Sequence, residues 1–294
     1  MKKLTLIIIS LYLFSCSSDP KQEVKVSTAN ELAETQISGS ASEMNSAETA
    51  EQKPVEKVIE KSEVKSAPQP SAASLYSTLN EAIKVQNDDG IQKASSEILT
   101  QNSKDVRGLN ALALFHYKKG HFEAAQFLLN KAIAANPKLS ELYGNLALVQ
   151  LAKNDRRDAI KTFRKALELN PQDAIAGANL GALYVQDKDY NKAYLSLEIP
   201  IKKGLKEVKI LNNYAIASVG VGKVKEAAEI YEKLLKENPS QREVMLNYSI
   251  LLIENMQKNK EGLDLLNRLK FVGAPQEARD TIKNLEIKAK AGLQ

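Results

Sequence analysis

The sequence predicts an all-α fold in which helix hairpins repeat along the chain. Asn-Pro pairs begin at positions 136, 170 and 238, so the intervals between them are 34 and 68 residues. A fixed period of this length is typical of a solenoid built from repeated hairpins. Between these markers, apolar residues recur at three- and four-residue steps in pairs of helix-length blocks, and short polar turns separate the blocks. Each period is therefore predicted to be one helix hairpin.

Four consecutive units, which begin at residues 106, 140, 174 and 208, carry small and aromatic side chains in phase. One small position is occupied by Ala113, Ala147, Gly181 and Ala215. Phe163 and Tyr231 are suited to fill the gaps between hairpins, and a proline follows the second helix in three of the units. This pattern resembles the tetratricopeptide repeat. The resemblance implies a right-handed α-solenoid of helix hairpins in which these residues serve packing.

The ends of the array match the repeat less closely, as expected for terminal units that face solvent on one side. Residues 72–105 are predicted to form a degenerate first repeat, because Asn102-Ser103 keeps the period. A fifth unit begins at Arg242, but its second half fits only after one inserted residue. The main array thus occupies residues 106–273. Residues 274–294 are predicted to form a C-terminal capping helix and tail.

Pro200 departs from the pattern, because the other units have alanine or leucine at its position. Within a helix, proline removes a backbone hydrogen bond and clashes with the preceding turn, which costs about 3 kcal/mol. The second helix of this unit is therefore expected to kink or stop near Ile199, with residues 202–204 looping out. The proline either alters the curvature of the solenoid or is tolerated.

The N-terminus is predicted to be an export signal with a site of lipid attachment. A basic start precedes an apolar run from Leu4 to Phe14, which is too short to span a bilayer. The run ends in Leu-Phe-Ser-Cys, which resembles the lipobox of bacterial lipoproteins. Residues 1–15 are then a signal peptide, and Cys16, the only cysteine, is acylated by chains such as palmitate. The alternative is an ordinary secretory signal with a chance cysteine.

Residues 16–71 are predicted to be a disordered tether between the membrane and the folded domain. The stretch contains no aromatic residue and is rich in Ser, Glu, Lys and Ala, so it cannot bury enough apolar surface to offset the entropy of ordering it. Ser17 and Ser18 replace the aspartate that favours inner-membrane retention in enteric lipoproteins. The resemblance therefore implies an exported protein that is lipid-anchored, with the periplasmic face of the outer membrane as the expected location.

In tetratricopeptide arrays the first helix of each hairpin lines the concave side, so one stripe of these helices is the candidate site for a protein or peptide partner. The stripe is apolar and comprises Leu114, Tyr117, Leu148, Leu151, Val185, Ile216, Val219, Ile250 and Ile253. Beside it, at intervals of 34 residues, lie Asn145, Asn179, Asn213 and Asn247. These amides resemble the asparagine ladder of the O-linked N-acetylglucosamine transferase family, which grips peptide backbones. Helix-to-helix hydrogen bonding is the alternative role.

Other classes of function find little support in the sequence. A single cysteine excludes a Cys-rich zinc site and an iron–sulfur cluster, and His116 and His121 have no partner in a metal-ligand pattern, so no metal is predicted. No phosphate loop, nucleophile elbow or paired-acid motif is present, so neither a cofactor nor an enzyme activity is expected. The net charge is +5, but Lys is spread along alternating helices, which argues against nucleic-acid binding.

The predicted function is a membrane-anchored adaptor or scaffold that binds a protein or peptide partner in the bacterial envelope and assists the assembly of an envelope machine. The layout is similar to that of lipoproteins that pilot outer-membrane secretins of type IV pili. Two alternatives stay open. The first is a homo-oligomeric structural lipoprotein, and the second, more remote, is a cell-wall-remodelling enzyme.

Overall fold

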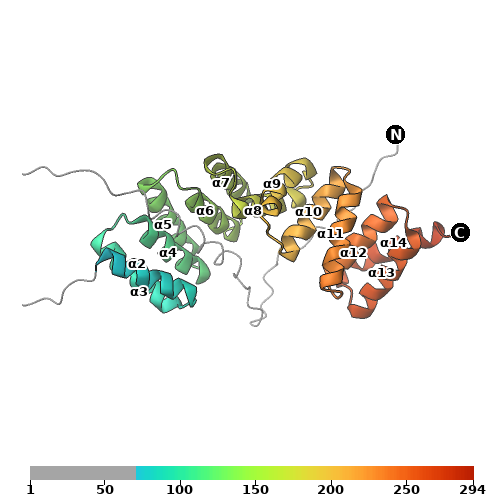
Figure 1. The fold of residues 1–294 in the computed structure, drawn as a ribbon, viewed down its shortest axis with the longest axis horizontal. Coiled ribbons are helices and arrows are strands. Elements are labelled where there is room, and N and C mark those ends of the chain that lie inside the picture. Colours follow the sequence, from blue (N-terminus) through green and yellow to red (C-terminus); the bar gives the residue numbers. More distant parts are fainter. Residues whose placement is uncertain (1–70) are drawn as a thin grey trace, which may run out of the picture. The chain divides into compact units, whose positions relative to one another are not determined.

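A computed structural model describes residues 71–294. The predicted signal peptide, the lipidated Cys16 and the tether up to residue 70 lie outside the described residues. Every regular element of the described part is a helix, and consecutive helices pair as hairpins, which confirms the predicted all-α solenoid class (Figure 1). Contacts within this part define two compact units, residues 71–138 and residues 139–294.

The first unit contains two hairpins. Its helices are α2 (Ala72–Lys84), α3 (Asp88–Gln101), α4 (Val106–Lys118) and α5 (Phe122–Ala135). Three of them begin at a residue whose side-chain oxygen accepts a hydrogen bond from the backbone N–H three positions later, the favoured N-cap arrangement. These caps are Ser71, Asn87 and Asp105. The core between α2, α3 and α4 consists of Leu75, Leu79, Ala94, Ile98 and Ala111.

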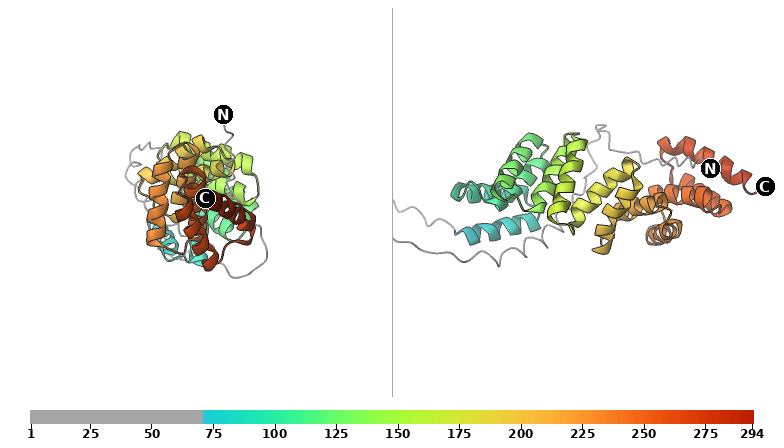
Figure 2. Two further views of the ribbon diagram at one scale, coloured as in Figure 1. Left: turned by 90° about the vertical axis from the view of Figure 1, so that its right-hand side faces the viewer. Right: turned by 90° about the horizontal axis from the view of Figure 1, so that it is seen from above.

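The second unit contains four hairpins and a final helix, and the right-hand view of Figure 2 shows its helices following one another in chain order. Its elements are α6 (Ser140–Ala152), α7 (Arg156–Leu169), α8 (Ala174–Gln186), α9 (Tyr190–Lys202), α10 (Val208–Gly220), α11 (Val224–Glu237), α12 (Arg242–Ile250), η1 (Leu251–Asn255), α13 (Asn259–Val272), η2 (Gln276–Ala278) and α14 (Arg279–Ala291). Helix α14 packs against α13 and buries Ile282, Leu285 and Ala289. The predicted capping helix is thus confirmed, although it begins only after a short 3₁₀ turn.

A left-handed backbone conformation marks the turn inside every hairpin. This conformation is uncommon for residues other than glycine, yet here it recurs once in every hairpin. Positive φ angles at these turns occur at Gln86, Gly120, Asn154, Lys188, Gly222 and Gln257. The first five of these positions are 34 residues apart, and the last interval is 35. The repeat therefore extends without a break from α2 to the last hairpin, and one extra residue lies within that hairpin.

The extra residue is absorbed inside the first helix of the last hairpin. Helix α12 continues as the π-helical turn η1, in which each hydrogen bond spans one residue more than in an α-helix. At the end of this turn, the backbone N–H of Met256 donates to the carbonyl oxygen of Leu251 at 3.1 Å. The turn explains why the second half of this unit fits the repeat only after one inserted residue.

Pro200 does not end its helix, so the expected stop near Ile199 is wrong. Helix α9 continues to Lys202, and the turn begins only with the following two residues, of which Gly204 has a positive φ. The backbone N–H of Leu205 donates to the Pro200 carbonyl at 3.0 Å, which closes the helix end as a Schellman motif does. Because the proline lies in the last turn, only one backbone hydrogen bond is lost.

Helices α8 and α9 approach each other closely because two glycines of α8 face α9. A Cβ atom on Gly177 would lie 2.8 Å from the Ser196 carbonyl oxygen and 3.3 Å from Cδ of Pro200. A Cβ atom on Gly181 would lie 2.4 Å from Cγ of Leu197. Helix α9, including Pro200, therefore packs directly against the backbone of α8 at Gly177 and Gly181.

The residues predicted to serve packing are buried. Ala113, Ala147 and Ala215 are fully enclosed between helices, and Phe163 and Tyr231 are among the largest fully buried side chains of the described part. Burial raises the pKa of the Tyr231 phenol, so this side chain stays neutral in the core. The small positions thus set the spacing between helices, and the two aromatic rings fill the space that the spacing leaves.

Candidate functional site

The predicted inner stripe of the second unit consists of partly exposed residues and core residues. Leu148 and Leu151 on α6, Val219 on α10 and Ile250 on α12 are partly buried and keep some surface. The other members are buried, with exposed fractions of 1% for Val185, 7% for Ile216 and 3% for Ile253. These three are corrected from ligand contacts to core positions, because their side chains pack within clusters of the chain itself.

The π-helical turn supplies the reason for one of these corrections. A Cβ atom on Gly262 of α13 would lie 2.4 Å from Cγ1 of Ile253. The extra residue in η1 thus brings Ile253 against the next helix and removes it from the solvent-facing side. The other hairpins could not have indicated the burial of Ile253, because none of them contains this insertion.

In the first unit, the predicted stripe residues Leu114 and Tyr117 lie on α4 and are both partly buried. The Tyr117 ring lies 5.9 Å from the ring of Phe122, measured between centroids. Burial raises the pKa of Tyr117, so its phenol is neutral at ordinary pH. Both side chains keep enough surface to contact another molecule.

The four asparagines occupy one position of the repeat but have different surroundings. The Nδ2 group of Asn179 donates to the Ile175 carbonyl of its own helix at 2.9 Å. The Nδ2 group of Asn247 donates to Oδ1 of Asn212 at 3.0 Å, and both side chains are buried. Asn145 also has an interaction within the chain. The row is therefore not one continuous ladder.

Asn213 is the exception among the four. It is partly buried on α10, and its amide makes no hydrogen bond to any other described residue. A side-chain amide offers two donors and one acceptor, and leaving such a group unpaired in a partly buried place costs free energy unless water or another molecule pairs with it. Asn213 is therefore the member of the row that has hydrogen-bonding capacity to spare.

A group of polar side chains joins α9, α10 and α11, and the sequence did not predict it. Nζ of Lys223 lies 2.6 Å from Oη of Tyr194 and 4.3 Å from the centre of its ring. The Tyr194 and Tyr214 hydroxyl oxygens lie 2.8 Å apart, and the Tyr214 hydroxyl donates to Glu226 at 2.7 Å. Burial and these hydrogen bonds raise the pKa of Tyr214. The group holds three consecutive helices in register.

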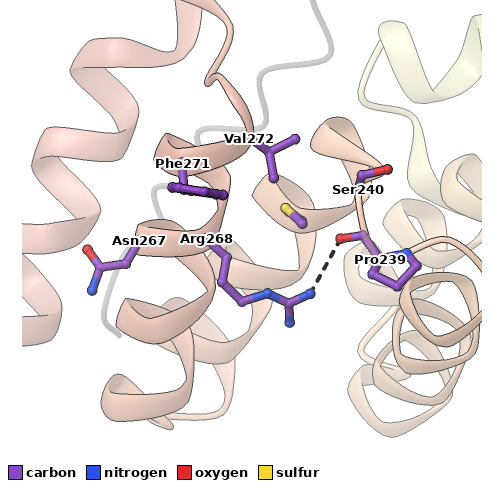
Figure 3. A pocket seen from close by; sticks show the side chains of 7 residues that line it. Pro239, Ser240, Asn267, Arg268, Phe271 and Val272 are labelled. Atoms are coloured by element: carbon purple, nitrogen blue, oxygen red, sulfur yellow. Dashed lines mark hydrogen bonds between the residues drawn. The ribbon is translucent and has the colours of Figure 1, made fainter.

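A cleft of about 510 Å³ opens beside the last hairpin (Figure 3). Pro239 and Ser240 form one wall, the end of α13 forms the other, and Met245 lies among them. Arg268 reaches across and donates to the Pro239 carbonyl at 3.4 Å. Phe271 stands at the rim with 94% of its side chain exposed. In the sequence, Phe271 falls outside the apolar stripe of its helix, and this is the one signal that could have indicated the cleft.

Neither a metal cluster nor a membrane-spanning helix occurs in the part of the chain that the structure describes. No group of three or more His, Cys, Asp or Glu side chains is arranged there to hold a metal ion. Among residues 71–294, no helix is both long enough and apolar enough to cross a membrane.

The repeated hairpins and their recurring left-handed turns define a helical-repeat protein. Two family models, both described as the tetratricopeptide repeat, match residues 106–139 and 140–173. These bounds coincide with two of the predicted units. The chain therefore contains tetratricopeptide repeats at residues 106–139 and 140–173.

Comparison with curated proteins gives more distant relatives. The chain is 27% identical over 180 residues to the type IV pilus assembly protein PilF of Pseudomonas aeruginosa. This alignment covers 60% of this chain and 70% of that protein. It is 25% identical over 138 residues to the tetratricopeptide repeat-containing protein trd-1 of Caenorhabditis elegans. This alignment covers 47% of this chain but only 18% of that protein. The second likeness therefore concerns the repeats alone.

Solved structures support the fold. YrrB, described as a tetratricopeptide repeat protein with an unusual peptide-binding site, aligns with a TM-score of 0.59 at 16% identity over 68% of this chain and 99% of its own. A tetratricopeptide repeat protein from Parabacteroides merdae aligns with a TM-score of 0.52 at 17% identity over 75% of this chain and 90% of its own. At these identities the likeness concerns the fold only.

Proposed function

We propose that the chain is a lipid-anchored adaptor that binds an extended segment of a protein partner in the bacterial envelope. The observation that carries this proposal is Asn213, whose partly buried amide has no hydrogen bond within residues 71–294. The same helix presents the partly exposed Val219, and other first helices present Leu148, Leu151 and Ile250. A spare amide beside apolar surface is suited to recognition and carries no reactive group.

The chemistry of these residues fits an extended peptide. A side-chain amide can donate to a backbone carbonyl and accept from a backbone N–H without reading the partner's sequence. The partly exposed leucine, valine and isoleucine side chains would then take up apolar side chains of the partner and supply selectivity. The partner is therefore expected to present an uncharged, extended segment with apolar side chains.

The relative from Pseudomonas aeruginosa supports a role in assembly. That protein is named for the assembly of type IV pili, and its similarity extends over more than half of this chain. We infer that the present chain assists the assembly of an envelope machine by holding one of its components. The homo-oligomeric structural lipoprotein is the competing function that the experiment below must exclude.

The anchor belongs to the same proposal. Cys16 would carry the acyl chains, and several chains together give stable anchoring because each buried CH₂ group contributes about 0.8 kcal/mol. The expected location is the periplasmic face of the outer membrane. Metabolic labelling with a fatty acid should mark the wild-type chain, and the Cys16→Ser variant should lose the label. A label that persists in that variant would contradict the anchor.

The partner is tested by crosslinking in cells that express the full chain, followed by capture and identification of the attached proteins. Asn213→Ala should reduce the amount of captured partner by about two- to tenfold, the effect of losing one hydrogen bond. Asn191→Ala is the matched control, because Asn191 is exposed on α9, a second helix. Equal capture by both variants would contradict the proposed site. Capture of the chain by itself alone would favour the homo-oligomer.

A further inference from the structure

The only two histidines of the chain come together at the turn between α4 and α5. His116 lies in the last turn of α4, and His121 is the residue that precedes α5. The backbone N–H of His121 donates to the His116 carbonyl at 2.8 Å, and Gly120 between them has a positive φ of 78°. The turn thus fixes the backbone of both histidines and directs both side chains to one place.

The ring nitrogens of the pair face each other. Nδ1 of His116 lies 3.4 Å from Nδ1 of His121, and the ring centroids are 5.6 Å apart. His116 is partly buried and His121 is exposed. The Phe115 ring contacts the His116 ring edge-on at 5.3 Å between centroids, which restricts the rotation of that imidazole.

The separation of the two nitrogens suits a shared metal ion better than a direct hydrogen bond. Hydrogen bonds from N–H groups are usually shorter, at about 2.9–3.0 Å. A tetrahedral Zn²⁺ ion lies about 2.0–2.1 Å from each imidazole nitrogen, which places two such nitrogens about 3.4 Å apart. Imidazole binds a metal ion in its uncharged form.

We propose that His116 and His121 bind one divalent transition-metal ion through their Nδ1 atoms. Imidazole ligands select ions of the zinc, nickel and copper type over magnesium or calcium. Only two ligands come from this part of the chain, so the remaining coordination positions are open to water or to a donor group of another molecule. The site is independent of the peptide-binding surface proposed above, which lies on other residues.

An acidic side chain of the neighbouring hairpin, Asp88, forms ion pairs with two lysines that precede the turn. Asp88, at the start of α3, pairs with Lys118 at 2.7 Å and with Lys119 at 2.9 Å. These hydrogen bonds lower the pKa of Asp88 and keep it ionised. No third His, Cys, Asp or Glu within residues 71–294 completes a cluster. The metal affinity is therefore expected to be that of a two-histidine site, weaker than that of a structural zinc site with four ligands.

The composition of the chain makes the test specific. The full chain contains two histidines and one cysteine, so a Cys16→Ser background removes the only thiol ligand. ZnCl₂ is titrated into this full-length protein while calorimetry measures stoichiometry and nuclear magnetic resonance follows the two histidine ring signals. The expected result is one ion per chain and a concerted shift of both signals.

Single and double variants test whether the two histidines are the ligands. His116→Asn and His121→Asn should each lower the affinity by at least about 10- to 100-fold, because loss of a ligand costs no less than loss of a group that only orients one, and the double variant should not bind. Asp88→Asn is the matched control and should bind as the parent does. Circular dichroism verifies that each variant is folded. No binding by the parent, or unchanged binding by the double variant, would overturn the proposal.

Discussion

At the scale of single residues, the four asparagines illustrate how far a sequence pattern reaches. The period correctly assigns all four to one position on successive first helices. It cannot assign their partners, because each partner depends on the neighbouring side chains. Asn247 pairs with Asn212, whose position is occupied by Ala178 and Gly144 in the two preceding hairpins, and Asn179 donates to its own backbone. Of the four, only Asn213 has an amide that makes no hydrogen bond to another described residue.

The pair of Asn247 and Asn212 is expected to contribute to stability. Asn247→Ala removes the donor and leaves the Asn212 carbonyl oxygen buried without a partner, so the free energy of unfolding should fall by about 1–3 kcal/mol. Asn213→Ala removes no hydrogen bond within the described chain and should change it by less than about 0.5 kcal/mol. Urea denaturation measures both values. Equal losses in the two variants would contradict the different roles assigned here.

At the scale of helices, the contact of α8 with α9 was the main point that the sequence did not predict. Pro200 suggested a broken helix when it was considered alone. The structure retains the helix because the proline lies in its last turn and because Gly177 offers a bare backbone against it. Compensation of this kind involves residues from different helices, so it cannot be derived from the local pattern of either one.

Two glycine substitutions test that contact. Gly177→Ala would place a Cβ atom 2.8 Å from the Ser196 carbonyl oxygen, so overpacking should lower the free energy of unfolding by about 1–3 kcal/mol. Gly144 in α6 has no atom within 4 Å of such a Cβ. Gly144→Ala should therefore be neutral or stabilising by up to about 1 kcal/mol, through better helix propensity. Thermal unfolding measures the stability of both variants. An unchanged stability of Gly177→Ala would contradict the close contact between α8 and α9.

The π-helical turn is a second feature at this scale, and the sequence did indicate it through the one-residue misfit of the last unit. Deleting Asn255 should restore a regular α-helix while both ends of the helix keep their orientation. The unfolding free energy should then change by less than about 1 kcal/mol.

Deleting Ser218 from the regular helix α10 is the control for this deletion. One residue corresponds to a rotation of about 100° in an α-helix, so the buried Tyr214 and Ala215 would turn out of the core. This variant should lose at least about 3 kcal/mol, as large core disruptions do. Chemical denaturation distinguishes the two outcomes. Comparable losses from both deletions would show that the turn is not an insertion.

At the scale of the whole molecule, the sequence predicted the number and register of the hairpins better than it predicted the surface between them. The left-handed turn residues follow the predicted 34-residue period from Gln86 to Gly222, and the last one, Gln257, comes one residue later than the period gives. The prediction that the inner stripe is exposed was only partly correct, because Val185, Ile216 and Ile253 are buried. A repeat fixes which residues share a position, whereas their exposure depends on how closely each pair of helices packs.

We propose that the first helices of the second unit bind a protein partner through the surface around Asn213. The most direct measurement replaces Asn213, and separately Asn191, with a photoreactive amino acid in the full chain and irradiates living cells. We expect a discrete crosslinked partner from position 213 and no such product from position 191 on α9. The same partner crosslinked equally from both positions, or only from position 191, would contradict it.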